Sequence, residues 1–518
     1  MKEIGYIMSG CSQNLVPFVL KETGKAYVNK YYFIPHPTLS HKDLFIPVLI
    51  RVFRVTPYNP EMSCGRPGPI AGKKGEPAHY GKQLEYEIAW AEVLGYFNED
   101  DKWYGLECAP GTWDPVFELD EKEIASFFTP ASNHPVNRAS SIEPHHAQIG
   151  RHRGLTIPLF LDLNSIAKAH MFVAGMTRSG KSCFVLNLIR KASEMKPSPR
   201  FIVFDRRGEY STLKKYGAVI VSYRQFLPKA DALTCDVVLN RLGFDSRNSA
   251  GKVVRDAMEA LTVEGKELTK DSLWEKLKEI SAFTLTRDRS RVLERIRWTI
   301  TTRGSFLDEK TITMDVIAAI FTSNILVIDL SVDTDVDAQH IAVRHIIRTI
   351  TDHAMARRNA GDFSAVIVIE EAQYFAPEKG LNIEVGNPEK IGVDRQLIEA
   401  ISQAGGYNVG FIILTQRPAY IQKSIISQCN TVVCFRLMAG NDQDAILKYT
   451  EYGNERLRDY LPGLADHEAI IWGIASPTPF PVIGEIEVKE YPKKAGVTAK
   501  QAWERMEQVL SQKPRIKP

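Results

Sequence analysis

The stretch from Phe172 to Ser182 constrains the fold of this chain more than any other. It reads FVAGMTRSGKS, which fits the pattern G-x-x-x-x-G-K-[S/T] and begins in an apolar run typical of a buried strand. The following residues 183–191, CFVLNLIRK, have apolar positions at helical spacing. A loop of this kind between a strand and a helix binds phosphate groups with its backbone amides. The pattern therefore predicts a P-loop within a domain of the α/β class.

The P-loop residues have distinct expected roles. Lys181 is expected to reach the β- and γ-phosphates of a nucleotide, and the Ser182 hydroxyl is expected to coordinate Mg²⁺. The other expected nucleotide contacts lie in the loop and at the start of the helix, and they are Gly175, Met176, Thr177, Arg178, Ser179, Gly180 and Cys183.

Composition sets the broad class of the protein. With 518 residues, 25% charged and 44% hydrophobic, the chain is typical of a soluble globular protein of roughly three domains. A net charge of +3 is only mildly basic, so any polyanion site depends on local placement of Lys and Arg. Seven scattered cysteines without a C-x-x-C pair suit a reducing compartment. Without a signal peptide or a long apolar run, a cytoplasmic protein with no membrane partner is expected.

Apolar patterning divides the chain into five expected segments. Short β-rich runs between Pro and Gly predict a small β-barrel and a linker at residues 1–140. From Leu155 onward, alternating strand and helix signals predict a parallel α/β core that a helical region interrupts. The expected boundaries are 141–245 for the first part of the core, 246–312 for a helical insertion or lid, 313–490 for the second part and 491–518 for a C-terminal helix and tail.

Near-continuous apolar runs predict the strands of the core. They are Met171–Ala174, Phe201–Phe204, Ala218–Val221, Ile325–Leu330, Ala365–Ile369, Gly410–Leu414 and Thr431–Phe435. The predicted N-terminal strands are Glu3–Met8, Leu15–Leu20, Tyr31–Ile34, Phe45–Val55, Ile88–Phe97 and Trp103–Cys108, with a loop at Pro57–Tyr80 and a linker at Ser132–Gly154. Within the helical region, Ser272 and Glu275 are predicted to form a capping box.

Two adjacent carboxylates end a predicted core strand. In the run VIVIEEA, Glu370 is expected to hold Mg²⁺, directly or through water, and Glu371 is expected to polarise the attacking water. Phosphoryl transfer needs both roles, because positioning and charge neutralisation supply most of its catalysis. Alone, the pair could equally be two solvated carboxylates, but its position downstream of a P-loop favours a hydrolase.

Two further strands end in polar residues. FIILTQRP closes with Gln416, which can hydrogen-bond a γ-phosphate or the lytic water, and DRRGEY places Asp205 and Glu209 after the second strand. Open α/β sheets bind their ligands at the carboxyl ends of such strands. The sequence contains no NKxD tetrad, which counts against a GTPase.

These motifs together resemble a known family. In order, the P-loop, D-x-x-G-E-Y at 205–210, EEA at 370–372, TQRP at 415–418 and SQCNT at 427–431 are similar to those of HerA, the hexameric DNA translocases of the HerA/FtsK group. QIG at 148–150 and ADHEAIIWG at 465–473 are similar as well. The resemblance covers about residues 148–485, and the β-rich opening matches the family's N-terminal HAS barrel in character only.

The resemblance implies a RecA-like P-loop NTPase core that hydrolyses ATP with Mg²⁺. It also implies a homo-hexameric ring that threads double-stranded DNA and works with a NurA-like nuclease in DNA end processing. Bacterial relatives also occur with effector proteins in antiphage systems. Carried over by position, Lys181 and Ser182 bind phosphate and Mg²⁺, Glu371 is the catalytic base, Gln416 is the sensor and Asp205 is the family's acidic position.

Departures from the family pattern concern arginines. Arg178 stands in the P-loop where the family usually has glycine, and AISQAGGYN at 400–408 replaces a usual basic run. The arginine finger that would act on a neighbouring subunit is therefore open. Arg395 is the nearest upstream candidate, followed by Arg417 and Arg436.

Seven cations that follow two of the predicted strands are candidate contacts to DNA. Each of them could equally be a solvated charge on the protein surface. Few aromatic residues accompany these cations, so no stacking groove for single strands is predicted there. Two functions remain: a DNA translocase that serves a nuclease, and a nucleotide-gated ring scaffold that activates an effector. A machine that handles peptides is disfavoured. The cations are Arg206, Arg207, Lys214, Lys215, Lys379, Lys390 and Arg395.

Overall fold

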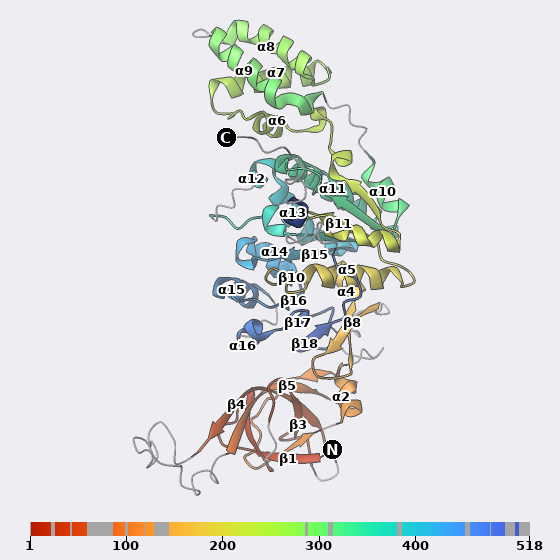
Figure 1. The fold of residues 1–518 in the computed structure, drawn as a ribbon, viewed down its shortest axis with the longest axis vertical. Helices are drawn as coiled ribbons and strands as arrows, with labels where there is room; N and C mark the ends of the chain where they lie inside the picture. Colours follow the sequence, from red (N-terminus) through yellow and green to blue (C-terminus); the bar gives the residue numbers. More distant parts are fainter. Residues whose placement is uncertain are drawn as a thin grey trace, which may run out of the picture. The chain divides into compact units, whose positions relative to one another are not determined.

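The computed structural model divides the chain into two compact units (Figure 1). Unit 1 comprises Met1–His145, Arg151–Phe160 and Ser476–Val482, and unit 2 comprises the remainder. None of the helices in the described residues has the length and hydropathy needed to cross a membrane. The structure describes residues 2–21, 26–41, 44–59, 86–98, 102–118, 120–128, 145–284, 289–308, 314–380, 386–450, 456–476, 478–492 and 503–506.

Unit 1 contains a closed antiparallel β-barrel. Its strands follow the order β2-β1-β7-β3-β4-β5, and pairing between β2 and β5 closes the barrel. Alternate residues such as Val16 and Phe18 point into the core, as the two-residue period of a strand requires. The strands are β1 (Lys2–Ile7), β2 (Leu15–Leu20), β3 (Tyr31–Pro35), β4 (Pro47–Tyr58), β5 (Tyr86–Phe97) and β7 (Pro115–Glu118), with β6 (Trp103–Tyr104) beside β5 and helix α2 (Glu121–Phe128) following.

A buried arginine joins two barrel strands to a late segment of the chain. The Arg51 guanidinium donates to Glu92 Oε1 from Nε at 2.8 Å and from a terminal nitrogen at 2.6 Å. Its other terminal nitrogen donates to the Pro481 carbonyl at 2.6 Å. Phe480 packs against Trp103 and Phe128 in the same unit. Residues 476–482 therefore complete unit 1, although Leu161–Ala475 of unit 2 separate them from its other residues in the sequence.

Unit 2 is built on a sheet whose central strands are parallel. Pairing is parallel from β12 through β16, and β17 is antiparallel to β16. The order is β12-β13-β11-β14-β15-β10-β16-β17-β18-β8-β9. The strands are β8 (His146–His152), β9 (Pro158–Asp162), β10 (Met171–Ala174), β11 (Phe201–Asp205), β12 (Val219–Ser222), β13 (Ile325–Asp329), β14 (Ala365–Ile369), β15 (Val409–Thr415), β16 (Thr431–Phe435), β17 (Glu468–Gly473) and β18 (Val482–Ile486).

Helices connect these strands and bury apolar residues. The long helix α11 places Ile346, Ile347 and Ile350 in the core. The helices are α4 (Leu163–Ala169), α5 (Lys181–Ser193), α10 (Val316–Thr322), α11 (Val336–Arg357), α12 (Pro388–Ile391), α13 (Val393–Ala404), α14 (Lys423–Gln428), α15 (Gly440–Tyr449) and α16 (Leu457–Tyr460), and short 3-10 helices include η2 (Glu209–Tyr216) and η6 (Ala372–Tyr374).

Four helices between β12 and β13 have an apolar core of their own (green in Figure 1). They are α6 (Cys235–Leu242), α7 (Ser249–Val263), α8 (Lys270–Thr284) and α9 (Arg289–Arg303). Leu273, Leu277 and Ile296 are fully buried among them. The predicted capping box at Ser272 and Glu275 is wrong, because helix α8 begins earlier. Thr269 and Ser272 instead exchange hydrogen bonds between their backbone amides and hydroxyls at 2.9 and 3.1 Å.

The structure confirms the predicted fold class, with an N-terminal β-barrel and a P-loop core. Each predicted core strand lies within a residue or two of an observed one. The linker predicted at Ser132–Gly154 is wrong in its second half, where His146–His152 form β8. Strands β7, β9, β17 and β18 and helix α2 were not predicted. The predicted loop at Pro57–Tyr80 lies largely outside the described residues, and so does most of the predicted C-terminal helix.

Candidate active site

Four strand ends bring the predicted motifs to one edge of the sheet. The order β11-β14-β15-β10 places side by side the strands that precede DRRGEY, EEA, TQRP and the P-loop. The register pairs Phe204 with Ile369 and Ala174 with Thr415, so the four strands end at the same level. Carboxyl ends of parallel strands are where such sheets bind ligands. The motifs therefore form one site.

The P-loop has a backbone that requires glycine at two positions. Gly175 has φ of 154°, and a Cβ there would lie 2.6 Å from Phe435 Cβ. Gly180 has φ of 118°, and a Cβ there would meet His467 Nδ1 at 2.8 Å. Arg178 has φ of 66°, a left-handed conformation that glycine adopts at lower cost. This conformation gives a physical reason for the glycine that the resemblance leads one to expect at position 178.

Lys181 folds back onto the P-loop. Its Nζ donates to the carbonyls of Gly175 at 2.7 Å and Met176 at 2.9 Å. Burial lowers the pKa of Lys181 to about 8, against the opposing attraction of Glu371. The ammonium therefore lies at the base of the loop, where a bound phosphate would replace the two carbonyls as its partner.

Glu370 and Ser182 form a pair suited to a divalent cation. The Ser182 hydroxyl donates to Glu370 Oε1 at 3.3 Å, and Glu370 Oε2 is buried with no partner among the described residues. Burial, followed by the nearby charges of Asp205, Glu209 and Glu371, raises the pKa of Glu370 to about 8. A cation would relieve this desolvation and repulsion, and Mg²⁺ prefers such oxygen ligands. The predicted metal ligands thus fit Mg²⁺.

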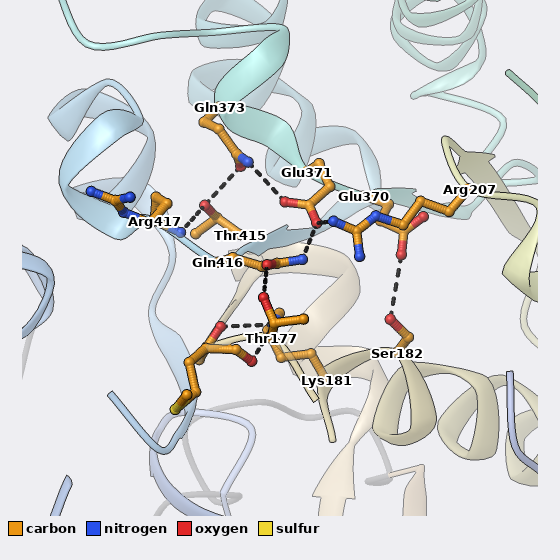
Figure 2. A network of polar contacts seen from close by, with 12 residues as sticks. Thr177, Lys181, Ser182, Arg207, Glu370, Glu371, Gln373, Thr415, Gln416 and Arg417 are labelled. Atoms are coloured by element: carbon orange, nitrogen blue, oxygen red, sulfur yellow. Dashed lines mark hydrogen bonds and ion pairs between the residues drawn. The ribbon is translucent and has the colours of Figure 1, made fainter. Parts of the chain in front are cut away.

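Glu371 is held by three side chains (Figure 2). Gln416 donates to its Oε1, Gln373 donates to its Oε2 at 2.7 Å, and Arg207 forms an ion pair with Oε1 at 2.6 Å. The backbone of Glu371 has φ of 52°, a strained conformation for a non-glycine residue. Such strain persists only where the surroundings fix the residue, and these three contacts do so.

The same network reaches the P-loop. The Thr177 hydroxyl donates to Gln416 Oε1, and Gln416 Nε2 donates in turn to Glu371 Oε1 (Figure 2). Thr415 Oγ1 donates to Gln373 Oε1 at 2.8 Å. The Gln416 side chain therefore connects the P-loop residue Thr177 to Glu371.

Asp205 stabilises a turn. Its Oδ1 accepts the backbone amides of Arg207 at 3.2 Å and Glu209 at 3.1 Å, and its Oδ2 accepts that of Tyr210 at 2.9 Å. Burial raises the pKa of Asp205, although these hydrogen bonds oppose the shift. The carboxylate therefore fixes the loop that carries Arg207.

Sequence reasoning assigned no role in this site to two residues of the network, Arg207 and Gln373. Arg207 was a candidate DNA contact, and Arg206 lies over the Tyr374 ring at 3.9 Å from its centroid. The sequence signal for Arg207 is its position two residues beyond β11. It becomes informative only once β11 is known to pair with β14.

The guanidinium groups of the candidate finger arginines make no contact with Glu371, although the Arg417 backbone amide donates to Thr415 Oγ1 at 3.0 Å (Figure 2). Arg395 is exposed on α13 and lines a cavity of ≈ 540 Å³ with Arg247 and Lys390. It makes no ion pair with any residue that the structure describes. Arg417 pairs with Asp442 at 3.4 Å, and Arg436 pairs with Asp466 at 2.7 Å.

Comparison with known proteins identifies the central part of the chain. The family model described as "Helicase HerA, central domain" matches residues 147–350. This region is a HerA central domain. It contains the P-loop, DRRGEY and the helical segment, and it adjoins β14 and β15, which complete the site. The chain is thus similar to HerA proteins in this region, and its core is that of a P-loop ATPase.

Curated HerA proteins are similar over most of the chain. The "DNA double-strand break repair helicase HerA" of Saccharolobus solfataricus is 26% identical over 396 residues, which cover 70% of this chain and 71% of that protein. The protein of the same name from Sulfurisphaera tokodaii is 24% identical, with 69% and 74% covered. Among solved structures, VirB4 of Thermoanaerobacter pseudethanolicus matches with a TM-score of 0.47 at 13% identity, over 66% of this chain and 96% of that chain.

Proposed function

We propose that this HerA-type ATPase is a translocase or helicase that acts on double-stranded DNA as a homo-hexameric ring. In this proposal it works with a NurA-like nuclease partner in DNA end processing. The observation that carries the proposal is the connection from the P-loop through Thr177 and Gln416 to Glu371. A motor needs its hydrolytic residue to respond to phosphate binding, and this connection supplies the response. The names of the curated relatives support DNA as the substrate.

Each residue has a proposed task in ATP hydrolysis. Lys181 leaves the carbonyls of Gly175 and Met176 and binds the phosphates, while the P-loop amides surround them. Ser182 and Glu370 would hold Mg²⁺, which would neutralise charge on the phosphates. Glu371 accepts the proton of the attacking water, and Gln416 orients that water.

Arg207 acts as a clamp on the base in the absence of nucleotide. Its guanidinium lies 2.6 Å from Glu371 Oε1, where it competes with water for the carboxylate. Its side chain is 43% exposed, so it is free to swing toward a newly bound anion. Burial lowers the pKa of Lys181, and the positive charge of Arg207 lowers it further. Phosphate binding between them would withdraw Arg207 and release Glu371.

Assembly would supply the remaining charge. Arg395 is exposed and free of ion pairs among the described residues, as an arginine that acts on a neighbouring subunit must be. In the proposed ring, Arg395 reaches the γ-phosphate held by the next subunit and stabilises the transition state.

The test is the steady-state ATPase rate with and without linear duplex DNA, at low and moderate salt. We expect stimulation by DNA that weakens with salt and disappears in Lys181→Ala, because phosphate contacts dominate sequence-independent binding. A rate unchanged by DNA would contradict DNA-coupled turnover.

One observation favours a second candidate, a nucleotide-gated ring scaffold that recruits and activates an effector. Arg206 and Arg207, two of the expected DNA contacts, are engaged with Tyr374 and Glu371. This function predicts that partner activation survives Glu371→Gln and that hydrolysis is indifferent to DNA. The translocase predicts the opposite result in both measurements.

A further inference from the structure

The net charge of helix α9 is higher than the net charge of the whole chain. It contains five arginines and one glutamate, a net charge of +4, whereas the 518 residues sum to +3. The rest of the protein is therefore slightly acidic, and the excess positive charge lies on one helix of the helical segment. Arg303 at its end lies against Gly243, so the others determine the exposed face.

The exposed face of α9 combines arginines with a large aromatic side chain. Arg291, Arg295 and Trp298 are spaced i, i+4 and i+7, which places them in one stripe about 10 Å long. Ile296 and Ile300, on the opposite side, are buried in the helical core. Trp298 is 65% exposed, although tryptophan is the side chain that burial favours most by area.

The arginines of this face have no ion-pair partners in the described part of the chain. Arg291, Arg295 and Arg297 are all exposed, and Arg297 lies 5.5 Å from the centroid of the Trp274 ring. Other exposed cations of the helical segment are paired, as Lys266 is with Glu264 and Arg247 with Asp245. Unpaired guanidinium groups beside an exposed indole match the two contacts of an unpaired nucleic-acid strand, which are phosphate pairing and base stacking.

We propose that Arg291, Arg295 and Trp298 form a binding face for single-stranded DNA. The arginines pair with successive phosphates, and a base stacks on the Trp298 ring. Duplex DNA fits this face less well because its bases are already stacked within the helix. The face lies outside the ATPase site, so the inference does not rest on the function proposed above.

The test is fluorescence anisotropy of a labelled 20-nucleotide thymidine strand with the full chain, without nucleotide, at 50 and 200 mM salt. Trp298→Ala is expected to weaken binding by about 5- to 150-fold, the usual effect of losing one stacked base. The double variant Arg291→Ala/Arg295→Ala is expected to weaken binding and to lower the salt slope by about 1.4, or about 0.7 per phosphate. Lys252→Ala/Arg358→Ala removes the same charge from exposed positions elsewhere and should change neither quantity.

A variant that should strengthen binding distinguishes loss of the binding face from misfolding of the protein. Glu294 is the one acidic residue of the exposed face, and Glu294→Gln should tighten binding of the strand. The proposal is overturned if the double arginine variant binds like the wild type. It is also overturned if Trp298→Ala has no effect, or if polyglutamate competes as well as the oligonucleotide, because the face would then be a general polyanion surface. A loss confined to a blunt duplex probe would likewise overturn it.

Discussion

Glu371 is the residue at which backbone strain, hydrogen bonding and charge meet. Its left-handed backbone turns the carboxylate away from the path of β14, toward Gln416 and Arg207. A strained residue at the end of a strand is typical of catalytic positions, because strain costs stability and is kept where geometry matters. The contacts on both carboxylate oxygens fix its orientation before any substrate binds.

Glu371→Gln should abolish hydrolysis and keep nucleotide binding. Glutamine has the same shape and keeps acceptor capacity at one atom, but it cannot take a proton from water. We expect turnover to fall by about 10²- to 10⁴-fold, the usual contribution of a general base. Turnover and binding of a fluorescent ATP analogue would be measured in parallel. Substantial residual turnover would assign the base to another residue.

The variant Arg207→Ala distinguishes two roles for Arg207, a clamp on Glu371 and an arginine that takes part in hydrolysis. A clamp that is removed leaves Glu371 free, so basal ATPase without DNA should rise and stimulation by DNA should shrink. The matched control is Lys214→Ala, an exposed cation on the same 3-10 helix that follows DRRG. If Arg207→Ala instead loses activity to the extent that Glu371→Gln does, Arg207 belongs to the hydrolytic machinery.

Sequence reasoning found the P-loop and both glutamates because each is a local motif at a strand end. It did not assign Arg207 or Gln373 to this site, since their roles depend on which strands pair and on the turn at Glu371. The proposed roles of Asp205 and Arg395 remain predictions. Asp205 uses both oxygens on backbone amides, and Arg395 needs a second subunit to act.

At the scale of elements, apolar runs predicted the parallel strands of the core, from β10 to β16. Strand β8 was missed because its buried Ala147, Ile149 and Gly150 are interrupted by polar residues, so the run reads as a linker. Helices α7 and α8 were found from their apolar spacing. The sequence did not reveal the positive face of α9. Its five arginines could all be solvated surface charges until the structure shows which of them have ion-pair partners.

A cavity in the core of helices α6–α9 should destabilise these helices and leave the nucleotide site intact. Leu277 is fully buried in the core of α6–α9, and Leu277→Ala should cost about 2–5 kcal/mol of unfolding free energy there. Hydrogen exchange would show faster exchange in α7–α9 and unchanged protection of β10 and β14. Val263→Ala, at a side chain that is 89% exposed, is the control. Equal loosening of the central strands would show that the two regions unfold together.

At the scale of the whole molecule, buried histidines make stability depend on pH. His170 Nδ1 accepts the Phe411 amide at 3.1 Å, and its Nε2 donates to the Ile401 carbonyl at 2.8 Å. Burial lowers the pKa of His170 to about 4, so the folded state keeps it neutral while the unfolded chain takes up a proton below about 6.5. Its stabilising contribution is complete above pH 6.5 and declines as the pH falls toward 4.

Lowering the pH from 7 to 5 should therefore cost about 2 kcal/mol through His170 alone. Hydrogen exchange of β10 and β15 at pH 7, 6 and 5, corrected for intrinsic rates, would measure the loss. His170→Asn should be less stable at pH 7 and show a shallower dependence, whereas His41→Gln, at an exposed histidine, should keep the wild-type slope. An unchanged slope in His170→Asn would assign the pH dependence to other groups.

The Arg51 contact with Pro481 has a consequence for synthesis. The two residues are 430 positions apart, and the hydrogen bond from the Arg51 guanidinium to the Pro481 carbonyl cannot form until residue 481 has emerged. At about 5–20 residues per second, the ribosome leaves the strands of the barrel waiting roughly 20–90 seconds for the segment that completes them. A nascent chain halted before residue 476 would lack this segment and also β18, which lies between β17 and β8 in the sheet of unit 2. The first strands to be translated therefore mature only together with the last ones.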